Sequence, residues 1–498
     1  MLGCYGHPDM KTPALDRLAA EGIRFDRAYC CQPVCGPARS AIFTGLFPHS
    51  NGVFGNSLAP GVNIRTVGQR MRDHGFHTAY IGKWHLDGGD YFGLGKCPPG
   101  WDDAYWYDMK RYLDELSPAD RVRSRFFETS HEVDETFTFG HRVSNRAVDF
   151  LDKHADEDFL LVVSYDEPHG PYLCPKPWCD LYADYEFPKS PNVWDRLEDK
   201  PEHLRLWAGR KLAEDKDALK IGYQHFLGCN AFVDHQIGRV LNAVDRLVPG
   251  ALVVYTSDHG DMMHSHSITN KGPAMFDEIT RIPFIVRWPG VAPEGQTCPH
   301  PVSHIDVVPT LMDAAGLDVP KWLDGVSLVE TFADPTVRAN DAVFMEFHRY
   351  EIDHDGFGGF QPIRCVTDGR YKLVVNLLDT DELYDLANDP HEMTNLIDSS
   401  EHAKVRDALH DRLLLWMDET RDVMRGYHWR CRPWRPDAKP TWDGSGKTRQ
   451  VENEEYEDRQ LDYNTGLPMT EATRSKGGMS LDDARALIER MKAGGENT

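Results

Sequence analysis

Two uninterrupted apolar runs place the strongest limit on the fold. Residues 159–165 read Phe-Leu-Leu-Val-Val-Ser-Tyr, and residues 251–256 read Ala-Leu-Val-Val-Tyr-Thr. Runs of this kind predict central strands that are covered on both faces. Between them, residues 233–247 carry apolar side chains at strict helical spacing and predict a core helix. Buried strands that alternate with such helices indicate an α/β fold.

Ionisable residues come directly after the predicted strands. They are Lys83 and His85 after residues 77–81, His169 after residues 159–165, and Asp258 and His259 after residues 251–256. In an open α/β sheet, ligands bind beyond the carboxyl ends of the strands. Lys83 and His85 are two apart in what reads as extended chain, so we expect both side chains to point the same way. The sequence therefore predicts a polar site at this edge of the sheet.

A helix that begins close to a cysteine is predicted within residues 30–45. Pro37 suits the first position of a helix, and Gly45 can end it. Cys35 would then lie at the helix entrance, where free N–H groups and the positive end of the dipole attract an anion. A nucleophile at residue 35 would meet an anionic group there, although an isolated cysteine in a turn is more often structural.

Five motifs in this chain resemble, in the same order, those of the formylglycine-dependent (type I) sulfatases of the alkaline-phosphatase-like superfamily. The first is Cys35-x-Pro37-x-Arg39 with Ser40 and Thr44-Gly45. The others are Gly82-Lys83-Trp84-His85, Pro168-His169-Gly170-Pro171, Asp258-His259-Gly260 and Asn270-Lys271-Gly272.

The resemblance implies an α/β fold with a large mixed central sheet between helices and a smaller C-terminal subdomain of antiparallel sheet and helix. We expect a catalytic domain over residues 1–340, the subdomain over 341–425 and a tail over 426–498. Short strands near residues 342–347, 371–375 and 382–386 and an amphipathic helix through Val405, Leu409, Leu413 and Trp416 suit the subdomain. The tail includes a helix capped by Ser480 and Asp483 and could join two copies of the chain.

Hydrolysis of a sulfate ester is the activity that the resemblance implies. A maturation enzyme would convert Cys35 to formylglycine, whose hydrate attacks sulfur. Lys83 and Lys271 would neutralise charge on the sulfuryl oxygens. His169, together with Lys271, would deliver a proton to the leaving oxygen. The substrate would be a small sulfated molecule, for example an oligosaccharide.

Further roles follow from the same resemblance. His85 would remove the remaining hydroxyl proton so that sulfate is expelled, and Arg39 would hold the nucleophile in place. A hard divalent cation, Ca²⁺ or alternatively Mg²⁺, would be held by Asp258 and His259 beside Cys35. Relatives carry an upstream apolar strand that ends in an Asp-Asp pair, which also holds the metal. We therefore expect weak metal affinity unless such a strand precedes the first residue.

Composition limits the partners and the compartment. The net charge of −24 argues against a nucleic-acid surface, so an anionic substrate would need a locally positive pocket. No run of about 18 apolar residues exists, which predicts no membrane span. The eleven scattered cysteines suggest free thiols, with Cys174 and Cys179 as a pair that could bridge. Without a signal peptide we expect a cytoplasmic protein, or a periplasmic or secreted one if the N-terminus is truncated.

Three functions stay open at this point. A carbohydrate sulfate is the favoured substrate because long insertions, such as residues 90–140, are rich in aromatic side chains. One alternative is a phosphonate or phosphodiester hydrolase of the same superfamily. The other alternative is an inactive homologue that binds sulfated glycans.

Overall fold

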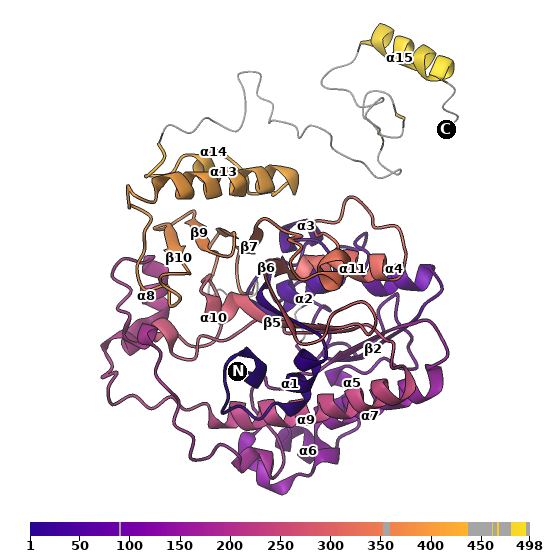
Figure 1. The fold of residues 1–498 in the computed structure, drawn as a ribbon, viewed down its shortest axis with the longest axis vertical. Coiled ribbons are helices and arrows are strands. Elements are labelled where there is room, and N and C mark those ends of the chain that lie inside the picture. Colours follow the sequence, from indigo (N-terminus) through magenta and orange to yellow (C-terminus); the bar gives the residue numbers. More distant parts are fainter. Residues whose placement is uncertain (89–90, 352–358, 437–460, 462–465, 468–479, 495–498) are drawn as a thin grey trace.

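Two layers of helices enclose the central strands (Figure 1). The structure is a computed structural model that describes residues 1–88, 91–351, 359–436, 461, 466–467 and 480–494. One face is covered by α1 (Pro13–Ala20), α7 (Phe139–His154) and α9 (Gln224–Leu247). The other face is covered by α2 (Cys35–Thr44), α4 (Val67–Asp73) and α11 (Val307–Ala314). The predicted α/β architecture is confirmed.

The central layer consists of two separately hydrogen-bonded sheets. The strands are β1 (Ile23–Tyr29), β2 (His77–Gly82), β3 (Phe159–Ser164), β4 (Val253–Thr256), β5 (Arg281–Arg287) and β6 (Gln296–Ser303). One sheet has the order β4-β5-β1-β6, and the other pairs β2 with β3. Because β1–β6 and β2–β3 are parallel while β1–β5 and β4–β5 are antiparallel, the layer is mixed, as predicted.

A cavity of 1490 Å³ is lined by every residue of β3 and β4. Among the described residues, β3 pairs only with β2, and β4 pairs only with β5. Most side chains of these two strands are half-buried, because they face this cavity. Each of the two is an edge strand of its sheet, so the prediction that both apolar runs form central strands is wrong.

Helix α2 begins two residues earlier than its proline suggests. Val34 is the extended N-cap residue, and the N–H of Gly36 donates to Oδ1 of Asn56 at 2.8 Å. A side chain from twenty residues further on thus satisfies one of the free N–H groups of the first turn. Gly45 ends the helix in the left-handed conformation (φ 70°), as predicted. Cys35 consequently lies within the first turn of α2 rather than ahead of it.

The smaller C-terminal sheet is antiparallel throughout. It consists of β7 (Val343–Phe347), β8 (Ile363–Thr367), β9 (Tyr371–Asn376) and β10 (Glu382–Asp385), in the order β10-β9-β8-β7. Helix α13 (Ala403–Glu419) packs on it through Leu409, Leu413 and Trp416. This confirms the predicted subdomain of sheet and helix, while the boundaries at residues 340 and 425 stay predictions.

The remaining α-helices of the described chain lie outside these two layers and the smaller sheet's main helix. They are α3 (Pro48–Asn51), α5 (Met109–Asp114), α6 (Pro118–Arg123), α8 (Glu202–Ala208), α10 (Asp277–Thr280), α12 (Val329–Ala333), α14 (Tyr427–Arg430) and α15 (Leu481–Gly494). Ser480 accepts from the N–H of Asp483 and caps α15 as predicted. Most of the tail lies outside the described residues, so oligomer formation through it stays a prediction.

Two further expectations concern a disulfide bond and membrane-spanning helices. All eleven cysteines are free, so the bridge between Cys174 and Cys179 is not formed. None of the described helices is both long and apolar enough to cross a bilayer.

Candidate active site

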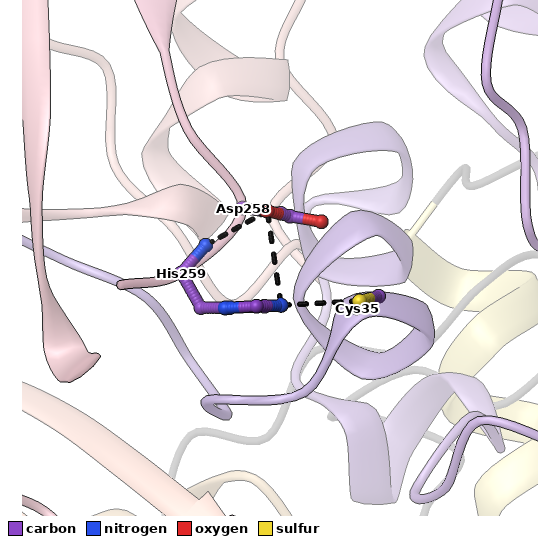
Figure 2. Close-up of side chains that lie close together, drawn as sticks. All are labelled: Cys35, Asp258 and His259. Carbon is purple, nitrogen blue, oxygen red and sulfur yellow. Dashed lines mark hydrogen bonds and ion pairs between the residues drawn. The ribbon is translucent and has the colours of Figure 1, made fainter. Parts of the chain in front are cut away.

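Cys35 lies in a local environment that favours negative charge. Its side chain is buried, and its Sγ is 3.1 Å from Nε2 of His259 (Figure 2). Burial alone would raise the pKa of the Cys35 thiol, but Lys271 and Lys83 outweigh burial and hold that pKa well below its ordinary value. The local electrostatic environment of residue 35 is therefore positive, although the whole protein has a net charge of −24.

Lys83 supplies one of these positive charges, directly after the carboxyl end of β2. Its ammonium group is 3.0 Å from Oδ1 of Asp166 and lies 4.7 Å from the centre of the Tyr91 ring. Burial would lower the pKa of Lys83, whereas Tyr91 and Asp166 raise that pKa well above its ordinary value. Lys83 is therefore a buried, protonated and firmly held cation.

Lys271 supplies the second charge, from the connection between β4 and α10. It lines the same cavity as Cys35. Burial would lower the pKa of Lys271, but Cys35 and then Tyr350 raise that pKa above its ordinary value. Lys271 consequently stays protonated across the neutral range.

Asp258 and His259 follow β4 and face Cys35 (Figure 2). Burial would raise the pKa of Asp258, but His259 and Lys83 keep this pKa far below its ordinary value. Nδ1 of His259 donates to the carbonyl of Gly260 at 2.8 Å, which leaves Nε2 turned toward the thiol. Burial would lower the pKa of His259, but the negative charge of Asp258 raises that pKa above its ordinary value.

Arg39 holds the carboxyl ends of β2 and β3 together. Its guanidinium group donates to the carbonyls of Lys83 and Trp84 and to the side chains of Tyr80 and Ser164. A longer ion pair, 3.8 Å, joins Arg39 to Asp258. Arg39 therefore positions the backbone that carries Lys83.

His169 lies on the loop after β3, and its ring faces Tyr91. The two ring centres are 5.1 Å apart. Nδ1 of His169 donates to the carbonyl of Gly170 at 3.0 Å. Burial, and then the charge of Lys83, lower the pKa of His169, so the ring is neutral near pH 7 with its lone pair at Nε2.

His85 is not among the residues that line the cavity. The backbone at His85 has φ 55°, so the chain is not extended there as expected, yet the side chains of Lys83 and His85 both contact Tyr91. The His85 ring packs edge-on against Tyr91, with the ring centres 5.1 Å apart. Nδ1 of His85 is buried and has no hydrogen-bond partner among the described residues. Tyr91 thus links His85 to Lys83, and the proton transfer assigned to His85 stays a prediction.

All the predicted site residues except His85 line one cavity. They are Cys35, Arg39, Lys83, His169, Asp258, His259 and Lys271. Sequence reasoning missed Asp166, which binds Lys83, and Tyr91, which contacts Lys83, Asp166 and two histidine rings. Asp166 also comes just after a strand, so the rule that found Asp258 would have found it. Tyr91 lies in an insertion with no motif to single it out.

Comparison with known proteins decides the family. The sulfatase family model matches residues 1–317, which is more than half of the chain. The chain belongs to the sulfatase family. The model of the C-terminal part of N-sulphoglucosamine sulphohydrolase also matches this sulfatase, over residues 266–419.

Relatives and solved structures agree with this assignment. Over 480 residues the sulfatase is 48% identical to the uncharacterized sulfatase YidJ of Escherichia coli (strain K12), an alignment that covers 94% of each chain. A structure solved with its substrate D-glucosamine-2-N,6-O-disulfate superposes with a TM-score of 0.70 at 23% identity, over 85% of this chain and 96% of that one. The phosphonate monoester hydrolase of Agrobacterium radiobacter superposes with a TM-score of 0.70 at 23% identity, over 86% and 95%. The protein is a type I sulfatase, a sulfuric ester hydrolase with the alkaline-phosphatase-like fold.

Proposed function

We propose that this sulfatase removes sulfate from a carbohydrate, through a formylglycine made from Cys35. The observation that carries the proposal is the pair of cations, Lys83 and Lys271, that line the same cavity as Cys35 and lower its pKa. A sulfate ester is an anion, and two fixed positive charges would bind its oxygens next to residue 35. These charges also stabilise the negative charge that grows on the sulfuryl oxygens during transfer.

Formylglycine would supply, as its hydrate, one hydroxyl that attacks sulfur and a second that allows sulfate to leave without another displacement at sulfur. The chain's own residues hold the ester during this reaction. The ion pair with Asp166 fixes the ammonium group of Lys83, so little reorganisation accompanies binding. Arg39 donates hydrogen bonds to the backbone carbonyls of Lys83 and Trp84 and thereby acts as a positioning residue for Lys83.

Two proton transfers complete the reaction. Lys271 would protonate the leaving oxygen beside His169, whose neutral ring can accept or relay a proton at Nε2. The proton of the remaining hydroxyl goes to an imidazole. The resemblance assigns this step to His85, whereas the contact geometry favours His259, whose Nε2 is in contact with residue 35. The pH profiles of His85→Gln and His259→Gln would separate the two assignments, because only loss of the histidine that accepts the proton should remove its titration from the profile.

The described residues do not by themselves fit a calcium site. Cys35, Asp258 and His259 offer one sulfur, one carboxylate and one ring nitrogen within 4.8 Å of one another. Calcium takes about six to eight oxygen ligands, so one carboxylate is too few. Arg39 also faces that carboxylate and competes with a cation for it. No step proposed above depends on a metal.

The cavity beside β3 and β4 offers room for further ligands. Both strands line it, each with one edge that has no strand partner among the described residues, and Met1 lines it as well. An apolar strand fused ahead of Met1 and ending in Asp-Asp would bring two carboxylates toward Asp258. We expect this fusion to raise the affinity for Ca²⁺ by roughly 100-fold, measured by isothermal titration calorimetry.

The matched control is the same fusion ending in Asn-Asn, which fills the cavity equally and adds no charge. Equal calcium affinities for the two fusions would show that carboxylates at this point do not complete a metal site.

A carbohydrate is the favoured carrier of the sulfate. The family model for the C-terminal part is named for a glucosamine sulfohydrolase, and one similar structure was solved with a glucosamine disulfate. Aromatic side chains of the kind that stack on sugar rings line the cavity. They are Tyr172, Tyr185, Phe187, Phe226 and Tyr350.

Rates on three substrates test this proposal. Protein made together with a formylglycine-generating enzyme should hydrolyse a glucosamine sulfate with a kcat/KM at least about tenfold above that for a phosphonate monoester or an aryl sulfate. A higher kcat/KM for the phosphonate would instead identify a phosphonate hydrolase. Binding of the sugar sulfate without turnover, in protein whose residue 35 is converted, would identify a silent glycan-binding homologue.

A further inference from the structure

A second cluster of ionisable side chains lies at the end of β2 opposite to Lys83. His77 is the first residue of β2, and His154 is the last residue of α7. Glu157 lies in the connection between α7 and β3. The cluster therefore joins a strand, a helix end and a loop at the amino ends of β2 and β3.

Both histidines turn the same ring nitrogen toward one carboxylate. Nδ1 of His77 is 2.8 Å from Oε2 of Glu157, and Nδ1 of His154 is 2.8 Å from Oε1. One potential ligand atom from each of the three residues lies within 4.8 Å of the others. Two imidazole nitrogens and one carboxylate are a ligand set that suits Zn²⁺, with a fourth position left for water.

The outer nitrogen of each histidine also has a fixed partner. Nε2 of His77 donates to Oδ2 of Asp102 at 2.8 Å, and Nε2 of His154 lies 2.9 Å from the hydroxyl of Tyr105. Histidines that bind metals usually donate their second N–H to such a group, which sets the tautomer and leaves the first nitrogen for the metal. Ordinary surface ion pairs do not need these outer partners.

The rings are held in place by packing. The centres of the His77 and His154 rings are 4.3 Å apart, and Phe150 packs against both of them. The histidine side chains are about four-fifths buried, whereas that of Glu157 is 49% exposed. A metal ion can therefore reach ligands that already have little freedom to lose.

We propose that His77, His154 and Glu157 form a zinc site that fastens the end of α7 and the following loop to β2. Zinc would bind the two Nδ1 atoms and Glu157 in place of the hydrogen bonds that now join them. The site lies at the opposite end of β2 from Lys83, and it does not depend on the proposed function.

Zinc titration by calorimetry tests the proposal. A Cys35→Ala, Cys179→Ala background removes the sulfur ligand of the two other described clusters that offer both sulfur and imidazole to zinc. In that background, His154→Gln and Glu157→Gln should each remove one equivalent of bound zinc. Asp102→Asn should weaken this site by about 10- to 100-fold, because it loosens His77 without removing a ligand. His300→Gln is the control, since His300 is outside the cluster and bonds to a backbone carbonyl.

Thermal unfolding gives an independent readout. Zinc should raise the melting temperature of the background and of the His300→Gln variant, but not that of Glu157→Gln. Glu157 is exposed, so this variant should fold even if loss of His154 does not allow folding. The proposal is wrong if the background binds no zinc, or if Glu157→Gln keeps the same number of zinc equivalents.

Discussion

Replacing Cys35 by alanine should lower kcat/KM for the sulfated sugar by at least about 1,000-fold. The change removes the side chain from which the attacking group is made, while the cations around it remain. The measurement is the rate of sulfate release by protein made together with the maturation enzyme. Its fold should be intact, because alanine is smaller and suits the first turn of a helix.

Cys31→Ala is the matched control for this variant. Cys31 is as buried as Cys35 and contacts Oγ of Ser303, outside the cavity. We expect Cys31→Ala to cost about 1 kcal/mol of stability and to keep most of the activity. Similar activity losses in both variants would show that burial of the cysteine, and not its chemistry, matters.

Replacing Lys372 by methionine should strongly destabilise the fold. The side chain of Lys372 is fully buried in β9, and its ammonium group binds Asp277 of α10 at 2.6 Å and Glu392 at 2.9 Å. Burial would lower the pKa of Lys372, but Asp277 and Glu392 keep it above its ordinary value. Without this cation the buried Glu392 loses its ion-pair partner and Asp277 keeps only the more exposed Arg281, which costs about 3–5 kcal/mol.

The urea midpoint of unfolding measures this loss. Lys153→Met is the control, because Lys153 makes an exposed ion pair with Asp149 on α7 that contributes little. A midpoint for Lys372→Met equal to that of the control would show that this buried group does not hold the smaller sheet against the α10 segment.

Much of the fold could be read from local patterns. The apolar runs around Val162 and Val254 form strands, and the helical spacing from Val233 onward forms α9. The pairing of strands joins residues far apart in sequence, so no local pattern revealed that β3 and β4 border a cavity. The predicted start of α2 was wrong because Asn56, twenty residues further along the chain, accepts a hydrogen bond from its first turn.

The candidate site was predictable where the chain follows regular geometry. Lys83 and Asp258 come just after a strand and line the cavity with residue 35, whereas Lys271 lies in a loop and was found only through its family motif. His85 is absent from the cavity lining, and its positive φ shows that the chain after Lys83 does not continue as an extended strand. Tyr91 could not be predicted, since only the folded chain brings it against Lys83.

The mass of the peptide that contains residue 35 tests the central proposal most directly. The protein should be made in cells that also convert the cysteine of a known type I sulfatase, which serves as the internal reference. We expect an aldehyde at residue 35, seen as the mass of formylglycine and as reaction with a hydrazide. An unmodified thiol in folded protein from those cells would contradict the proposed chemistry.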